Sequence, residues 1–178
     1  MFIIDLKEVE HMRLFVAVKL SPGAKQLIKD TQMIFRKLDV SGNYTSEENM
    51  HLTLAFIGEY DDPDKVMDAL NEVSFEPFEI TLGETGRFGD LWWMGVYKSG
   101  ELDLLAEKVR KALDDKGVPY DPKKFKAHIT FLRRAVYKGT KPGRIPAEPV
   151  KMPVESFSLF RSDRGRYGMI YTEIGKVQ

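Results

Sequence analysis

The sequence predicts an α+β protein made of two similar halves, and three observations lead to this class. Segments with the alternation of strands and segments with the apolar spacing of helices follow one another along the chain. The phrase HLTL at His51 returns as HITF at His128, 77 residues later, close to half of the chain that follows Met12. Hydrophobic residues fill 43% of 178 positions, enough for one proper core. A duplicated lobe explains the repeated phrase.

In the first half of the chain, the sequence predicts two strands and two helices. The apolar run 13–20 is typical of a buried strand, and residues 22–39 begin with a proline and carry apolar residues at helical spacing. Residues 50–57 predict a second strand, which Gly58 closes. A single apolar stripe then predicts a short helix near 63–73.

The second half predicts a similar order. Residues 78–88 and 91–99 form an expected hairpin pair of strands, and a helix over 101–116 follows, ended by Gly117. Residues 128–134 then predict a strand.

The remainder of the chain combines a loop and a hairpin. The proline-rich stretch 138–151 is expected to be irregular and exposed. Residues 154–174 predict a closing hairpin with its turn near 163–166.

Composition narrows the possible functions. Zero cysteines exclude disulfides, thiolate catalysis and cysteine-based metal sites. No apolar run approaches the roughly 18 residues of a membrane span, and the N-terminus lacks a secretory pattern, so we expect a cytoplasmic protein. The His11-Met12 dipeptide is typical of a cloning site, so residues 1–11 are expected to be vector-derived, with one domain over 12–178.

Charge is unevenly distributed, although the formal net charge is zero. Between Glu59 and Glu84, nine acids face one lysine, a net of −8. Between Pro119 and Lys151, nine basic residues face two acids, a net of +7. Charge runs are commonly solvated faces, but this basic run brackets the second copy of the phrase. It therefore indicates a phosphate-binding surface.

The repeated phrase places a histidine and a threonine together. Because side chains in a strand alternate faces, His51 and Thr53 share one face, while Leu52, Leu54 and Phe56 share the other. His128 and Thr130 repeat this pattern. A single such pair is usually a partly buried histidine bonded to a neighbour, whereas two copies favour a polar groove backed by helices.

Two histidines and two threonines suit the chemistry of a phosphodiester. Near neutral pH one imidazole can be a base while the other is an acid, and threonine hydroxyls donate to phosphoryl oxygens. Metal chemistry competes for histidines, but no third ligand stands at a suitable spacing. The sequence also lacks a serine elbow, a P-loop and a G-x-G-x-x-G turn.

The paired HLTL and HITF phrases resemble the H-x-T-x motifs of the two-histidine phosphoesterase superfamily. Within it, the chain is most similar to the RNA 2′,3′-cyclic phosphodiesterases, also called 2′-5′ RNA ligases. The resemblance covers nearly the whole chain from Met12. It includes the opening segment MRLFVAVKLSP, both motifs with their flanks, ENMHLTLAFIGE and HITFLRR, and the closing segment FSLFRSDRGRYGMIYTEI.

The resemblance implies a bilobal α+β fold with pseudo-twofold symmetry. Antiparallel sheets would line a central cleft, helices would lie outside, and each lobe would supply one motif. By similarity, His51 is the general acid that protonates the leaving 3′ oxygen, and His128 is the general base that activates water. Thr53 and Thr130 would hold phosphate oxygens. The resemblance also implies that the reaction uses neither a metal nor a nucleotide cofactor.

The resemblance also selects Arg133, five residues after the second histidine, for phosphate binding. Strict strand alternation would instead place Arg134 beside His128, and only a bulge would turn Arg133 into the groove. Aromatic residues near the groove are candidates for stacking on a base, although most aromatics at strand spacing belong to a core. The candidates are Phe15, Tyr44, Phe88, Trp92 and Trp93.

The expected function is the hydrolysis of RNA 2′,3′-cyclic phosphate ends to 2′-phosphates, with tRNA fragments among the substrates. We expect 2′-5′ RNA ligation as a related activity, and we expect the protein to be a monomer. Two alternatives stay open. One is a related phosphoesterase acting on 2′-5′ oligonucleotides or on a small cyclic nucleotide. The other is a non-catalytic RNA-binding domain.

Overall fold

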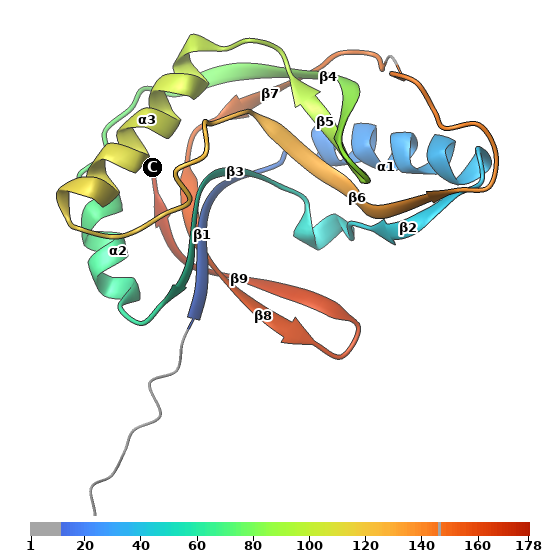
Figure 1. Cartoon of the computed structure of the whole chain (residues 1–178). Helices are drawn as coiled ribbons and strands as arrows, with labels where there is room; N and C mark the ends of the chain where they lie inside the picture. Colours follow the sequence, from blue (N-terminus) through green and yellow to red (C-terminus); the bar gives the residue numbers. More distant parts are fainter. Residues whose placement is uncertain (1–11, 146) are drawn as a thin grey trace, which may run out of the picture.

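The computed structural model describes residues 12–145 and 147–178 and shows two antiparallel sheets with helices on their outer sides (Figure 1). The expected α+β class is confirmed. The segment 1–11, expected to be vector-derived, lies outside the described residues.

The first sheet has the strand order β3-β1-β8-β9 and joins the two ends of the described chain. Strand β1 (Met12–Lys19) pairs with β3 (His51–Tyr60) on one side and with β8 (Phe157–Gly165) on the other. Strand β9 (Gly168–Val177) pairs with β8 as the closing hairpin. The first histidine therefore begins an edge strand of this sheet.

The second sheet has the order β2-β6-β5-β4-β7. Strand β6 (His128–Tyr137) lies between β2 (Val40–Tyr44) and β5 (Leu91–Val96). Strand β4 (Phe78–Phe88) pairs with β5 and with β7 (Val150–Val154). The second histidine thus begins an inner strand.

Each predicted helix is present and begins at a capping side chain. Helix α1 (Pro22–Lys37), helix α2 (Pro63–Leu70) and helix α3 (Gly100–Asp115) lie close to the predicted bounds, and a short 3-10 helix, η1 (Glu47–Asn49), precedes β3. An oxygen of the residue before each helix accepts a backbone N–H of the first turn, which satisfies a donor that the helix leaves unpaired. These caps are Ser21, Asp62 and Ser99.

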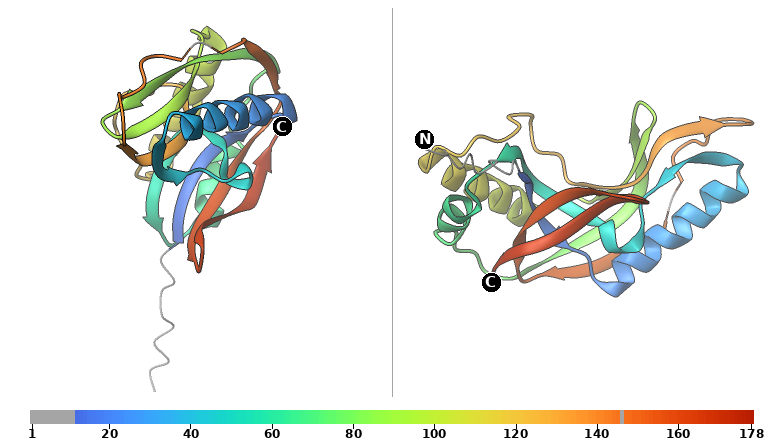
Figure 2. Two further views of the ribbon diagram at one scale, coloured as in Figure 1. Left: turned by 90° about the vertical axis from the view of Figure 1, so that its right-hand side faces the viewer. Right: turned by 90° about the horizontal axis from the view of Figure 1, so that it is seen from below.

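The two lobes are interlocked because α1 and α3 each follow a strand of one sheet and pack against the other sheet. Helix α1 follows β1 of the first sheet, yet it packs against β2, β6 and β7 of the second sheet. Helix α3 lies between β5 and β6, and it packs against β3 and α2. Figure 2 shows α2 and α3 together at one end of the molecule and α1 at the other. The strand–helix–strand unit therefore occurs twice, as the repeated phrase predicts.

Two strands were missed by the sequence prediction. Strand β2 has little apolar alternation, since Ser41, Gly42 and Asn43 are exposed, and its pairing with β6 holds it in place. Strand β7 includes the last two residues of the stretch 138–151, which was predicted to be irregular. Its Pro153 is tolerated because β7 is an edge strand of the sheet.

Several predicted boundaries were also wrong. Strand β5 ends at Val96 and not at residue 99, and β6 continues beyond residue 134 to Tyr137. Gly58 does not close β3, since the strand continues to Tyr60. Gly58 has a positive φ of 84°, which glycine adopts without strain. The closing hairpin turns at Arg166 and Tyr167, between the paired glycines Gly165 and Gly168, and so later than predicted.

A continuous apolar core lies between the sheets and their helices. Phe35 of α1 stands edge-on to Trp92 and Phe131, with ring centroids 4.8 and 5.1 Å apart. Trp92 is therefore a core residue, and its indole N–H donates to the Tyr137 hydroxyl at 2.7 Å. A smaller cluster around Phe15 lies apart from this core.

Gly86 of β4 lies opposite Trp93 of β5, and a methyl group at Gly86 would overlap the indole ring. Overpacking of this kind costs about 1–3 kcal/mol. We expect Gly86→Ala to lower the free energy of unfolding in urea by that amount. In the control Gly139→Ala, the added methyl meets nothing within 4 Å, so we expect a change within about 0.5 kcal/mol. Equal losses in both variants would contradict this packing.

Candidate active site

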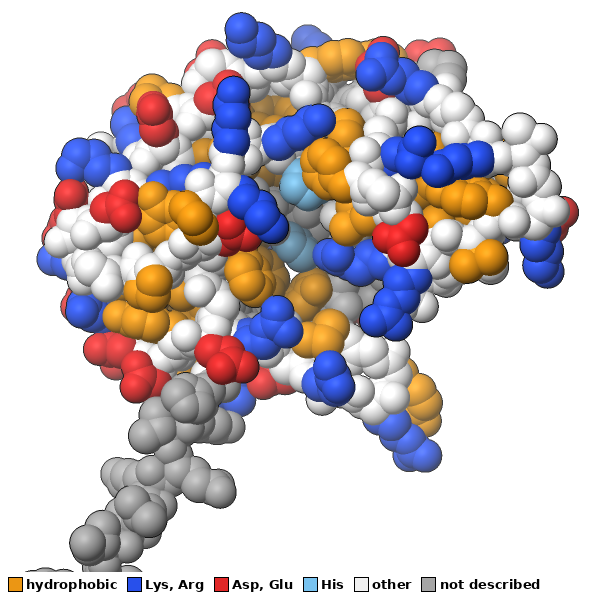
Figure 3. All heavy atoms as spheres, in the orientation of Figure 1, with side chains coloured by type: hydrophobic (Ala, Val, Ile, Leu, Met, Phe, Trp, Pro, Cys, Tyr) orange, Lys and Arg blue, Asp and Glu red, His pale blue; other side chains and the backbone are white. Residues whose placement is uncertain are grey.

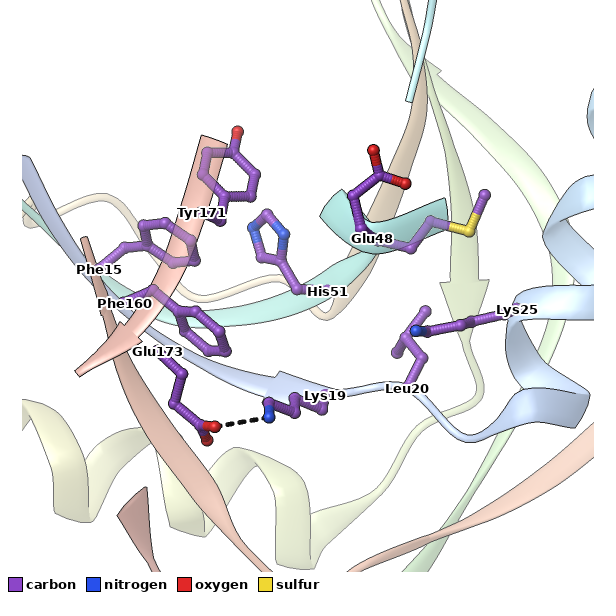
Figure 4. A pocket seen from close by; sticks show the side chains of 10 residues that line it. Phe15, Lys19, Leu20, Lys25, Glu48, His51, Phe160, Tyr171 and Glu173 are labelled. Carbon is purple, nitrogen blue, oxygen red and sulfur yellow. Dashed lines mark hydrogen bonds and ion pairs between the residues drawn. The ribbon is translucent and has the colours of Figure 1, made fainter. Parts of the chain in front are cut away.

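His51 is fixed by one hydrogen bond and two aromatic rings. Its Nδ1 lies 2.7 Å from the carbonyl oxygen of Asn49, two residues earlier. The centroids of the Phe15 and Tyr171 rings lie 4.7 and 5.2 Å from that of the imidazole. Figure 4 shows these rings beside His51, with the Phe160 ring, which stacks on Phe15, below them in the view.

His128 repeats this arrangement in the second sheet. Its Nδ1 lies 2.6 Å from the carbonyl oxygen of Lys126, again two residues earlier. The rings of Phe88 and Trp93 lie 5.3 and 6.3 Å away. Since a carbonyl can only accept, Nδ1 of each histidine carries the hydrogen, and Nε2 of the neutral ring is left as a proton acceptor.

The structure brings the two motifs to one place. Strands β3 and β6 belong to different sheets and approach within 8 Å between Cα atoms. Thr53 of the first motif and His128 of the second line one cavity. In Figure 3 the two histidines lie side by side in a hollow that has Lys and Arg side chains on both sides.

The threonines lie where strand alternation predicts. Thr53 and Thr130 are half-buried, whereas Leu52 and Ile129 beside them are fully buried in the core. Each threonine therefore shares the face of its histidine.

Each motif strand has a bulge just after its threonine. In the β1–β3 ladder Val16 pairs with Ala55 and Ala17 with Thr53, which leaves Leu54 as the extra residue. In the β5–β6 ladder Phe131 is the extra residue. A bulge reverses the alternation beyond it.

The first bulge corrects one prediction. Phe56 was expected on the face opposite His51, but the residue is 38% exposed and lines the same cavity as Thr53. It reaches that cavity because Leu54 and Ala55 are both buried, so that the next side chain points the other way.

The second bulge bears on the choice between the two arginines. Phe131 and Leu132 are both buried, which directs Arg133 to the face of His128. The charge of Arg133 acts on both His51 and His128. Arg134 has a positive φ of 54° and is exposed, and no comparable effect on either histidine is found for it.

Both imidazoles are neutral at pH 7. Burial lowers the pKa of His51 to about 4, and the positive charges of Arg133 and His128 act in the same direction. Burial also lowers the pKa of His128, with Lys126 and Arg133 adding to the effect. Both rings are therefore proton acceptors, and neither is a proton donor, at neutral pH.

A second cavity, of about 350 Å³, lies on the other side of His51 (Figure 4). Lys19 donates to Glu173 at 2.6 Å, and the buried Ser158 hydroxyl donates to the other oxygen of the same carboxylate. Burial and these two donors act on Glu173 in opposite directions, and its pKa is lowered overall. A third cavity, lined by Arg133 and Tyr171, opens toward the β8–β9 turn.

Sequence reasoning missed several residues around His51. Tyr171 and Phe160 come from the closing hairpin, and no local motif marks them. The Asn49 carbonyl is a backbone group, and it is held because the Asn49 side chain donates to the Met169 carbonyl at 2.8 Å. Of the aromatic candidates, Phe15 lies beside His51, Phe88 and Trp93 lie beside His128, and Tyr44 packs under the Arg36 guanidinium.

Within residues 12–145 and 147–178, no three His, Cys, Asp or Glu side chains gather as metal ligands would. No helix in the same ranges is both long enough and apolar enough to cross a membrane.

Known proteins resemble this chain in sequence. Residues 36–166 match the model of the 2′-5′ RNA ligase superfamily. An RNA 2′,3′-cyclic phosphodiesterase of Archaeoglobus fulgidus is 38% identical over 131 residues, which cover 68% of this chain and 72% of that protein. The Thermotoga maritima protein of the same name is 28% identical over 184 residues, covering 94% and 95%.

Solved structures resemble it as well. LigT of E. coli, crystallised with 3′-AMP, has a TM-score of 0.79 at 26% identity and covers 94% of this chain and 98% of its own. A Thermus thermophilus protein has a TM-score of 0.76 at 27% identity, with coverage of 93% and 96%. These likenesses confirm the resemblance drawn from the repeated phrase. The chain therefore belongs to the 2′-5′ RNA ligase superfamily.

Proposed function

We propose that this protein hydrolyses the 2′,3′-cyclic phosphate end of RNA to a 2′-phosphate, without a metal ion. The observation that carries the proposal is the pair of histidines from facing strands, each with Nδ1 bonded to a carbonyl and Nε2 free for substrate. The names of the Archaeoglobus and Thermotoga relatives support the cyclic phosphate as substrate.

In the proposed reaction, His128 removes a proton from water as its oxygen attacks phosphorus. The bond between phosphorus and the 3′ oxygen breaks, and His51 gives its proton to that oxygen. The phosphate stays on the 2′ oxygen. When the 5′ hydroxyl of a second RNA replaces water, the same steps form a 2′-5′ linkage, which accounts for ligation by the same site.

The proposed acid must first gain a proton, because burial lowers the pKa of His51 to about 4. A phosphodiester is an anion, and between the two rings it opposes the positive charges that lower this pKa. Substrate binding therefore favours the one proton that the reaction needs. In the proposed reaction His51 receives this proton, because it faces the leaving 3′ oxygen.

Thr53, Thr130 and Arg133 are the proposed phosphate ligands. The threonine hydroxyls lie on the faces of the histidines and can donate to the non-bridging oxygens. Arg133 is exposed on the cleft side of its bulge and acts on both imidazoles, so its charge also reaches an anion held between them.

The histidines provide the direct test. General acid–base catalysis contributes about 10²–10⁴-fold per group, so His51→Ala and His128→Ala should each lower kcat/KM on cyclic-phosphate RNA by that factor. EDTA should leave the rate unchanged. Circular dichroism and urea unfolding check that both variants fold. More than about a tenth of the parent activity in both folded variants, or loss of activity in EDTA, would contradict the proposal.

The threonines test the phosphate site separately. A hydrogen bond to a charged group is worth about 1.5–3 kcal/mol, so Thr53→Ala and Thr130→Ala should lower kcat/KM roughly 10- to 150-fold. Thr→Ser should recover much of this loss, since the hydroxyl is kept.

Thr172→Ala is the matched control for these threonine variants, because Thr172 is an exposed strand threonine that lines none of the cavities described above. We expect parent activity from this control. Parent-like kinetics of the alanine variants at positions 53 and 130 would exclude the threonines as phosphate ligands.

A further inference from the structure

A groove of about 530 Å³ leads away from the paired motifs along the segment between α3 and β6. We call it the lysine groove. Thr53 and His128 line its inner end, and its lining includes four cationic side chains against one carboxylate, that of Asp121. The cations are Arg110, Lys123, Lys124 and Lys126.

The backbone that carries these lysines is held in place. Arg110 of α3 donates to the carbonyl oxygens of Leu54 and Lys123, at 3.3 and 2.7 Å. The Asp121 N–H donates to the carbonyl of Phe56 at 2.8 Å. Arg110 therefore ties the segment to β3, and the lysines are presented from a fixed backbone.

The lysine charges remain available to a ligand. Neither Lys124 nor Lys126 forms an ion pair with any residue in the described ranges. Lys123 lies 3.7 Å from Asp121 and its side chain is 87% exposed, so the pair is weak. Lys126 lies over the rings of Phe88 and Trp93, 5.1 and 4.8 Å from their centroids, which keeps its charge close to His128.

The other cavity beside His51 is less suited to an anion. The Glu48 and Glu173 carboxylates line it against Lys19 and Lys25, so its charges balance, and Lys19 is already paired with Glu173. The lysine groove has an excess of cations, and the exposed rings of Phe56 and Phe88 give its walls the mixture of charge and aromatic surface that single strands favour.

RNA with a cyclic phosphate can extend in one direction only. The 2′ and 3′ oxygens of the last ribose are both used by the ring, so the strand continues through the 5′ oxygen. We propose that the lysine groove binds the backbone phosphates on this 5′ side, so that the enzyme prefers RNA strands to cyclic mononucleotides. This inference rests on the proposed function.

The test compares two substrates in one double variant. The substrates are an octanucleotide that ends in a 2′,3′-cyclic phosphate, and adenosine 2′,3′-cyclic monophosphate, which has no 5′ phosphate. In Lys123→Ala/Lys124→Ala we expect the ratio of kcat/KM for the octamer to that for the mononucleotide to fall about tenfold. For the octamer, the slope of log kcat/KM against log salt concentration should become shallower by about 1.4. Each phosphate contact on a single strand contributes about 0.7 to this slope, and the variant removes two lysines.

Lys37→Ala/Lys98→Ala removes the same charge from exposed positions that line none of the cavities described above, and it should keep the parent ratio. If the ratio is unchanged in the groove variant, or falls equally in the control, the inference about the lysine groove is wrong, while the proposed function stands. If the parent protein turns over neither substrate, the proposed function fails, and the inference fails with it.

Discussion

The site depends on one hydrogen bond that occurs twice, from Nδ1 of a histidine to the carbonyl two residues earlier. Asn49 and Lys126 supply these carbonyls from the segments that lead into β3 and β6. The bond fixes the tautomer and the direction of each ring, so that Nε2 of the neutral ring is left as the proton acceptor. The Asn49 side chain is in turn bonded to β9, so the closing hairpin helps to orient the first histidine.

Two interlocked lobes bring these rings together. Helix α1 follows β1 of the first sheet but packs on the second sheet, whereas α3 connects β5 and β6 of the second sheet but packs on β3 of the first. The sheets therefore cannot be separated without exposing apolar helix faces. The bulge after each threonine then reverses the faces of the side chains beyond each motif. It directs Phe56 toward the cleft in one lobe and Arg133 in the other, so equivalent positions supply an aromatic ring and a cation.

Strand alternation predicts the shared faces of His51 and Thr53, and of His128 and Thr130, because both pairs come before their bulges. Beyond a bulge the prediction fails, as it did for Phe56, since one extra residue cannot be read from local apolar spacing. Strand β2 was missed because its partner β6, and not its own composition, holds it. Tyr171 and the Asn49 carbonyl required tertiary contacts, and the low pKa of His51 required its burial.

The pH dependence of kcat/KM tests the central claim most directly, because it reports the protons held by the pair in the free enzyme. The proposed reaction needs one neutral and one protonated imidazole, and both pKa values are lowered from 6.5, that of His51 to about 4. The singly protonated pair is lost as pH rises above the higher pKa, and as it falls below the lower one. The account predicts a bell with its maximum below pH 6.5. A maximum above about pH 7.5, or a steady rise to pH 9, would contradict it.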